Sequence, residues 1–250
     1  MCRSALRAHW PSSNAWGLAT VPSGDAKRKR QTQQERVAES SRRLLEAAIE
    51  VVAEKGYERA TAAEISERAG YSAPMVRTRY GSKQGLLDSI LHSVYDPWLL
   101  APADDALDGL QQVNAHLTRL EQVGEDQPEL MRFFLVLSFE CVTAARELKP
   151  WIQSFLTRYT ASLESMLRKG QADGSVDVAI DPAAEAQNIV SDGIGLAYIG
   201  LIASDNADFV TNMRHRRGAL TERLRPTNTS GQPAAETLKP TGTSGRRPRK

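Results

Sequence analysis

The sequence has few of the features that mark an exported, membrane-bound or metal-binding protein. It contains 2 cysteines, Cys2 and Cys141, which are far apart and form no C-x-x-C spacing. Neither a disulfide framework nor a zinc site is therefore indicated. No apolar run is long enough to cross a membrane, and none near the N-terminus could serve as the core of a signal peptide. We expect a cytoplasmic protein that holds no metal ion and no cofactor.

The motifs that catalytic sites usually require are also missing. The 4 histidines are scattered without an H-x-x-x-H pair, and there is no G-x-S-x-G nucleophile elbow or phosphate-binding glycine loop. The G-I-G sequence at residues 193–195 lies in a hydrophobic helical pattern and follows no strand, so it is not a dinucleotide-binding fingerprint. Residues 172–180 alternate briefly but have no partner strand, and we predict a loop there. The sequence thus predicts an all-α protein that is not an enzyme.

What the sequence does contain is two short helical patterns joined by a tight turn, in the segment T-A-A-E-I-S-E-R-A-G-Y-S-A-P-M-V-R-T-R-Y-G-S-K that begins at Thr61. Thr61 and Glu64 predict a capping box for the first helix, and Gly70 suits the left-handed backbone that ends it. Ser72 is predicted to cap the second helix, with Pro74 in its first turn. This is the helix-turn-helix layout, whose second helix enters a DNA major groove.

The spacing A-G-Y-S-x-x-x-V-x-x-x-Y-G-S-K-x-x-L-L resembles the DNA-binding signature of the tetracycline-repressor (TetR) family of bacterial transcription regulators. The match runs over about residues 42–91 and includes Gly56 and Tyr57. The resemblance implies an N-terminal three-helix DNA-binding domain and a C-terminal helical domain that binds a small ligand and forms a dimer. It also implies that the fourth helix, which follows Ser82, transmits ligand binding to the recognition helices.

The residues expected to meet DNA either lie on the face of the second helix opposite Val76 and Tyr80 or match contact positions of the family. They are Thr61, Ala63, Ser72, Ala73, Pro74, Met75, Arg77, Thr78, Arg79 and Lys83. Lys83 matches the family's phosphate-binding lysine. Arg77 stands where family members usually carry an aromatic residue, so the operator cannot be transferred from relatives. An arginine there can hold a phosphate or reach a guanine edge.

Amphipathic spacing predicts the other helices, at residues 34–55, 104–123, 128–148, 150–171, 182–203 and 207–224. The predicted domains are a helix-turn-helix domain at 34–82 and a ligand-binding and dimerisation domain at 83–225, flanked by disordered basic extensions at 1–33 and 226–250. The N-terminal extension could be a solubilising tail, an arm that reaches DNA phosphates, or the product of a mis-assigned start codon.

Two sets of candidate residues fall in the second domain. An apolar pocket with a few orienting polar groups could be formed by Trp98, His116, Phe133, Phe134, Leu137, Ser138, Glu140, Trp151, Phe155 and Tyr159. The aromatic members could instead simply fill the core. Glycines in a helix are unfavourable, so those between residues 189 and 202 suggest close helix packing, either within the chain or across a dimer. Since the last two helices form the dimer interface in the family, the candidates there are Ile189, Gly193, Leu196, Gly200, Phe209 and Met213.

The sequence therefore predicts a homodimeric, ligand-responsive repressor that binds a pseudo-palindromic operator. Its partners would be double-stranded DNA, a small effector and a second copy of the chain. The net charge is only +2, and the region between the basic ends is acidic overall. This charge balance keeps an alternative open, namely a helical ligand- or protein-binding module that no longer reads DNA.

Overall fold

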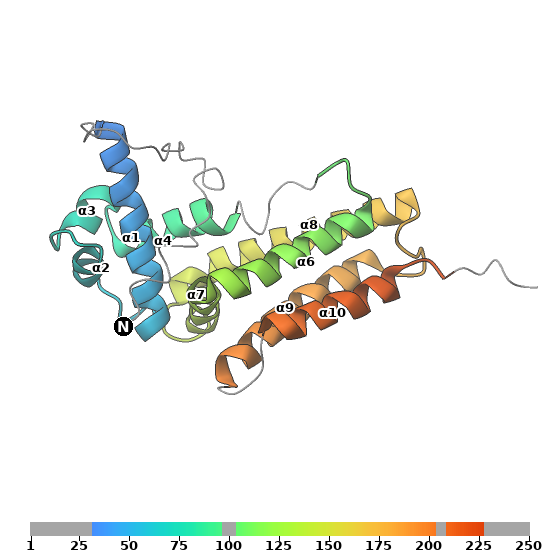
Figure 1. The fold of residues 1–250 in the computed structure, drawn as a ribbon. Coiled ribbons are helices and arrows are strands. Elements are labelled where there is room, and N and C mark those ends of the chain that lie inside the picture. Colours follow the sequence, from blue (N-terminus) through green and yellow to red (C-terminus); the bar gives the residue numbers. More distant parts are fainter. Residues whose placement is uncertain (1–31, 97–103, 204–208, 228–250) are drawn as a thin grey trace, which may run out of the picture.

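The structure is a computed structural model that describes residues 32–96, 104–203 and 209–227 (Figure 1). Every regular element in these ranges is a helix. None of the described helices is long and apolar enough to cross a membrane, and the described residues contain no cluster of potential metal ligands. The predicted disordered extensions fall almost wholly outside the described residues, as does Trp98.

Four helices pack together in the N-terminal part of the described chain: α1 (Gln33–Lys55), α2 (Ala62–Arg68), α3 (Met75–Tyr80) and α4 (Lys83–Ile90). A capping box starts α1, because the Thr32 hydroxyl accepts from the Glu35 N–H while the Glu35 carboxylate accepts from the Thr32 N–H. Gly56 ends the helix with a φ of 91°, a conformation that favours glycine. One apolar core unites the four helices, with their inward side chains almost fully buried at Leu44, Val51, Ile65, Val76 and Leu86.

The chain continues from α4 through a π-helical turn, η2 (Leu91–Tyr95), toward the second domain. That domain contains α6 (Gly109–Asp126), α7 (Pro128–Glu140), the short 3₁₀-helix η3 (Arg146–Leu148), α8 (Lys149–Asp173), α9 (Pro182–Ile202) and α10 (Phe209–Leu224). Figure 1 shows α6, α8, α9 and α10 side by side as a long bundle, with α7 between the bundle and α1. The contact of α7 with α1 joins the two domains.

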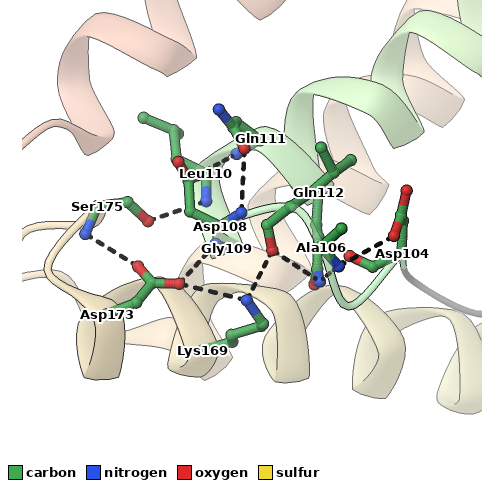
Figure 2. A network of polar contacts seen from close by, with 11 residues as sticks. Asp104, Ala106, Asp108, Gly109, Leu110, Gln111, Gln112, Lys169, Asp173 and Ser175 are labelled. Carbon is green, nitrogen blue, oxygen red and sulfur yellow. Dashed lines mark hydrogen bonds and ion pairs between the residues drawn. The ribbon is translucent and has the colours of Figure 1, made fainter.

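At the end of the bundle farthest from α1, the start of α6 is bound to the end of α8 (Figure 2). The Asp108 carboxylate accepts from the Gln111 N–H at 2.7 Å, and the Asp173 carboxylate accepts from the Gly109 N–H at 2.9 Å. Hydrogen bonds from the Ser175 hydroxyl and from Gly109 lower the pKa of Asp173 to about 2. The N–H groups of the first turn of α6, which have no partner within a helix, are satisfied in this way.

Two buried carboxylates attach α10 to its neighbours. Glu121 on α6 lies 2.5 Å from the guanidinium of Arg217, and Glu185 on α9 pairs with Arg223. Both glutamates are about 5% exposed or less, so each carboxylate needs its arginine to offset the loss of water. The mostly polar sequence of α10 can therefore pack in the bundle even though it presents a narrow apolar face.

The predicted helices agree with the structure except at two places. Residues 104–108 precede α6 instead of belonging to it, and the helix predicted over 128–148 ends at Glu140. Beyond Glu140 the N–H groups of the chain bond in tight turns, and that of Ala145 bonds to the Glu140 carbonyl. This turn buries Ala145 completely, a packing preference that helical periodicity did not reveal. The loop predicted over 172–180 is confirmed from residue 174 onward.

Candidate DNA-reading helix and apolar cavity

The two short helices α2 and α3 are joined by a serine that the sequence analysis did not single out. The buried hydroxyl of Ser66 donates to the Ala62 carbonyl at 2.8 Å and accepts from the Val76 N–H at 3.1 Å. The Val76 N–H lies in the first turn of α3 and has no partner within that helix. Ser66 therefore caps α3 from the neighbouring helix. The only signal in the sequence was a polar residue beside the inward-facing Ile65.

The predicted caps of these helices are only partly correct. Thr61 does cap α2, since its hydroxyl accepts from the Glu64 N–H at 3.2 Å. The Glu64 carboxylate, however, pairs with Lys55 at 2.5 Å, so the capping box is incomplete. Ser72 does not cap α3: the N-cap position is occupied by Pro74, which has no side-chain hydrogen bond, and Ser66 supplies the missing acceptor.

Most side chains on the outward face of the α3 region are short, and one of the described side chains there, that of Arg77, is a cation without a partner. Ala73, Pro74, Arg77 and Thr78 are exposed, whereas Met75 is half-buried against the core. The Thr78 hydroxyl donates to the Pro74 carbonyl. Among the described residues, the Arg77 guanidinium takes part in no hydrogen bond or ion pair. It is thus available to a phosphate or a base edge.

The other two predicted cations of this region are already engaged within the protein. Arg79 donates from Nη1 to the Val37 carbonyl and to the Ser41 hydroxyl, each at 2.7 Å, and so holds α3 against α1. Lys83 donates to the Tyr57 carbonyl at 2.6 Å, and its ammonium lies 4.0 Å from the centre of the Tyr57 ring. Burial lowers the pKa of Lys83. Both side chains stabilise the domain in this arrangement rather than face outward.

The acidic residues of α1 are largely neutralised by neighbouring arginines. Arg68 on α2 makes two hydrogen bonds to the Glu54 carboxylate, at 2.9 and 2.8 Å, and these bonds lower the pKa of Glu54. Arg42 pairs with both Glu39 and Glu46. An ion pair adds no net charge, so these pairs do not account for the acidic balance that keeps a module unable to read DNA open as an alternative. They do place an arginine beside Glu39, Glu46 and Glu54.

Glu140, predicted as a ligand-orienting group, lies instead at the junction of the two domains. Its carboxylate accepts from the Glu58 N–H at 3.1 Å, just beyond the end of α1. It also lies directly over Gly56, where a Cβ atom would come within 2.1 Å of Oε1. The chain turns at the end of α7 and directs this side chain toward α1, and Glu140 is not among the residues that line the cavity.

The second domain encloses an apolar cavity of about 610 Å³, a volume that includes its open mouth. The lining residues carry no charge and come from η2 and the helices of the domain. They are Tyr95, Leu120, Met131, Phe134, Leu135, Phe155, Leu156, Tyr159, Val190, Gly193, Ile194, Ala197, Phe209 and Met213. A concave, apolar lining of this kind is typical of a small-molecule site.

The predicted ligand residues divide between this cavity and the core. Phe134, Phe155 and Tyr159 line the cavity. The others that the structure describes do not, for reasons of packing: Phe133 and Leu137 are fully buried in the core, Ser138 bonds to its own helix, and Trp151 stacks on Phe155. The sequence could not separate them because α7 is apolar on nearly every face.

His116 lies behind the cavity rather than in its lining. Its Nε2 atom is 2.7 Å from the Tyr159 hydroxyl, and its Nδ1 atom has no hydrogen-bond partner. Burial lowers the pKa of His116 to about 3, so the imidazole is neutral at neutral pH. Tyr159 thus connects the cavity wall to a buried neutral histidine.

The residues predicted for a dimer interface mostly face inward. Ile189 and Met213 are buried within the protomer, and Gly193 and Phe209 are half-buried and line the cavity. Leu196 and Gly200 are half-buried. Sequence periodicity does not say which face of α9 meets the core, so it could not separate these positions.

The outward face of α9 is apolar: Tyr198, Ile199 and Ile202 are exposed beside Gly195. A Cβ atom on Gly195 would meet nothing within 4 Å. Packing within the described part of the chain therefore does not explain this glycine.

Comparison with known proteins identifies the chain. Residues 44–90 match the family described as bacterial regulatory proteins, tetR family. The helix-turn-helix segment of the chain belongs to the tetR family. The chain is 29% identical over 151 residues to HTH-type transcriptional regulators of Mycobacterium tuberculosis and Mycobacterium bovis, covering 55% of the chain and 70% of each relative. The segment that matches the family spans the C-terminal half of α1 and all of α2, α3 and α4.

Solved structures share the fold of the tetR-family chain at low sequence identity. The fatty acid degradation regulator FadR from Bacillus halodurans is 18% identical with a TM-score of 0.63, covering 80% of this chain and 100% of that protein. SmeT, the repressor of the Stenotrophomonas maltophilia multidrug efflux pump SmeDEF, is 16% identical with a TM-score of 0.61, covering 82% and 100%. The all-α fold is confirmed, and the family is one of transcription regulators rather than enzymes.

Proposed function

We propose that the chain is a homodimeric repressor that binds a pseudo-palindromic operator through α3 and leaves it when a small molecule fills the cavity. Residues 34–82 would form its DNA-binding domain and residues 83–225 its ligand-binding and dimerisation domain. The observation that carries this proposal is the position of Tyr95. This residue lines the cavity and lies in η2, which continues the helix α4 that begins at Lys83, directly after α3.

Tyr95 offers a physical route from ligand to DNA. Its hydroxyl donates to the Leu130 carbonyl at 2.5 Å, and its ring lies 5.7 Å from Phe134 and 6.4 Å from Phe155, both of which line the cavity. A ligand in the cavity that packs against these rings changes the packing around Tyr95, and the π-helical turn is a place where a helix adjusts readily. The effect on DNA affinity equals the difference in ligand affinity between the two arrangements.

DNA binding is tested first with DNA from the region flanking the gene, by gel shift and footprinting at two salt concentrations. We expect a protected pseudo-palindrome whose half-sites lie about 34 to 36 Å apart or more, stable to excess unlabelled competitor. A complex that disappears under competitor would leave only non-specific binding and would contradict the operator proposal.

Arg77→Ala is expected to weaken operator binding about tenfold and to reduce the slope of log affinity against log salt by about 1, because one phosphate or base contact is lost. The folded domain should keep its thermal midpoint, since the Arg77 guanidinium has no described partner. The matched control is Arg225→Ala, an exposed arginine beyond the end of α10, which should leave both quantities unchanged. Equal effects of the two substitutions would count against α3 as the DNA-reading helix.

Dimerisation through α9 and α10 is supported by the exposed apolar face of α9. Ile199→Asp should raise the dimer dissociation constant about 100-fold, because a carboxylate buried across an interface has no partner there. Sedimentation equilibrium measures this change. Val178→Asp is the matched control, since Val178 is 80% exposed in the loop before α9 and lies away from this face. An Ile199→Asp protein as dimeric as the control would refute the interface.

A further inference from the structure

We propose that Glu140 is a positioning residue that sets the orientation of the helix-turn-helix unit relative to the second domain, through the turn formed by Gly56, Tyr57 and Glu58. This turn follows α1 and is held from two sides, by the last residue of α7 and by the first residue of α4. The part of the inference that concerns regulation rests on the proposed function, because it gives the cavity a second route to α3 besides Tyr95.

On one side of the turn, the Glu140 carboxylate contacts the backbone of two of its residues. Its Oε2 atom accepts from the Glu58 N–H at 3.1 Å. Its Oε1 atom lies so close to Gly56 that a Cβ atom on this glycine would be 2.1 Å away. Helix α7 also packs against α1, which leads into the turn (Figure 1). The end of α7 therefore touches the backbone of the helix-turn-helix unit directly.

The position of Glu140 depends on α7 and on the turn that ends this helix. The Glu140 carbonyl accepts from the N–H groups of Thr143 and Ala145, at 3.0 and 2.9 Å, and Ala145 is completely buried. One helical segment connects Glu140 to Phe134, which lines the cavity, and six residues of helix span only about 9 Å. A shift of α7 at the cavity is therefore carried to Glu140.

On the other side of the turn, Lys83 binds its middle residue. The ammonium donates to the Tyr57 carbonyl at 2.6 Å and lies 4.0 Å from the centre of the Tyr57 ring. Burial lowers the pKa of Lys83, and the carboxylates of Glu58, Glu147 and Glu140 act against this effect. Lys83 begins α4 directly after α3. A displacement of the turn therefore acts on the helix that adjoins α3.

The first test measures the distance between the two domains in the full-length protein, without DNA or ligand. Nitroxide labels are attached at Glu67→Cys on α2 and Ser165→Cys on α8, both of which are exposed. Cys2 is replaced by serine, whereas Cys141 is kept because it is buried. A large excess of unlabelled protein suppresses distances between copies. Double electron–electron resonance then gives the distance distribution within one chain.

Glu140→Ala is expected to broaden this distribution, because the turn loses the acceptor that holds it to α7. Glu140→Gln keeps an oxygen that can accept from the Glu58 N–H, so it should retain the width of the wild type. The matched control is Glu125→Ala, which removes an exposed carboxylate from the last turn of α6 and should also retain that width. A loss of stability alone would not produce this pattern. An unchanged distribution in Glu140→Ala, or equal broadening in Glu125→Ala, would overturn the inference.

The second test measures operator affinity for DNA fragments whose half-sites are one base pair closer or farther apart, by gel shift. One base pair rotates a half-site by about 35° around the DNA axis, so a fixed orientation of the domains should make the wild type prefer one spacing. Glu140→Ala should lose most of this preference, because its helix-turn-helix units can adjust to either spacing. A variant that keeps the wild-type preference would overturn the route to α3.

The two tests separate this inference from the proposed function. Absence of any operator binding by the wild type would refute the proposed function, while the distance measurement would still decide the role of Glu140. Operator binding by the wild type together with an unchanged distance distribution in Glu140→Ala would do the opposite. It would leave the proposed repressor standing and remove Glu140 as a positioning residue.

Discussion

Gly109→Ala is expected to lower the free energy of unfolding by about 3 kcal/mol or more, the upper end of the effect of overpacking. Gly109 begins α6 where this helix crosses α8 (Figure 2). A Cβ atom there would lie 2.1 Å from the Gly170 nitrogen, 2.3 Å from its Cα atom and 2.5 Å from the Met166 carbonyl oxygen. All three are backbone atoms, which cannot rotate away as a side chain can. The two helices would have to separate, and the hydrogen bond between Gly109 and Asp173 would be lost.

Urea denaturation of the wild type and the variant at one protein concentration measures this loss. The matched control is Gly174→Ala, because Gly174 ends α8 with a φ of 80° and a Cβ atom there meets nothing within 4 Å. Its cost should be limited to about 1 kcal/mol of backbone strain. If Gly109→Ala were no more harmful than Gly174→Ala, the close crossing of α6 and α8 would be disproved.

Acidification from pH 7 to pH 5 is expected to remove about 2 kcal/mol of stability through His116 alone. Burial lowers the pKa of this imidazole in the folded protein from 6.5 to about 3. Between these values the unfolded chain binds a proton that the folded chain does not, so stability falls as pH falls through this range and stops falling below about pH 3. Each pH unit well below 6.5 is worth about 1.4 kcal/mol. At neutral pH, above both values, the effect is absent.

His116→Gln isolates this contribution from that of the carboxylates, which also titrate in acid. Glutamine is neutral at every pH used and can still hydrogen-bond to the Tyr159 hydroxyl. The difference in unfolding free energy between the wild type and the variant should shrink by about 2 kcal/mol from pH 7 to pH 5. A difference independent of pH would show that His116 is not held neutral by burial.

The two predictions concern two contacts between the same pair of helices, α6 and α8. The crossing at Gly109 fixes α6 against α8 at one end, and the His116–Tyr159 pair joins the same two helices farther along. The cavity lies beside this pair.

The sequence by itself determined the helical class, the family resemblance and the helix-turn-helix unit. Local signals suffice for these: Thr61, Gly70 and Gly81 mark helix ends through their own backbone chemistry, and the apolar spacing of α1 appears unchanged as its buried face. The family match over residues 44–90 rests on the same local pattern. Helix limits and turn glycines are encoded within a few residues, so they can be inferred without knowledge of the rest of the chain.

Only the tertiary structure decided which side chains line the cavity, which are buried in the core and which are exposed on the surface. Gly193 and Met213 face the cavity and Glu140 meets α1, although their helices were predicted correctly. Ser66 caps α3 across a gap of ten residues, a partnership that no local pattern contains. A helix whose faces are nearly all apolar, such as α7 or α9, can rotate without changing its periodicity. Its orientation is set by the shapes of the helices around it, which the sequence of that helix does not hold.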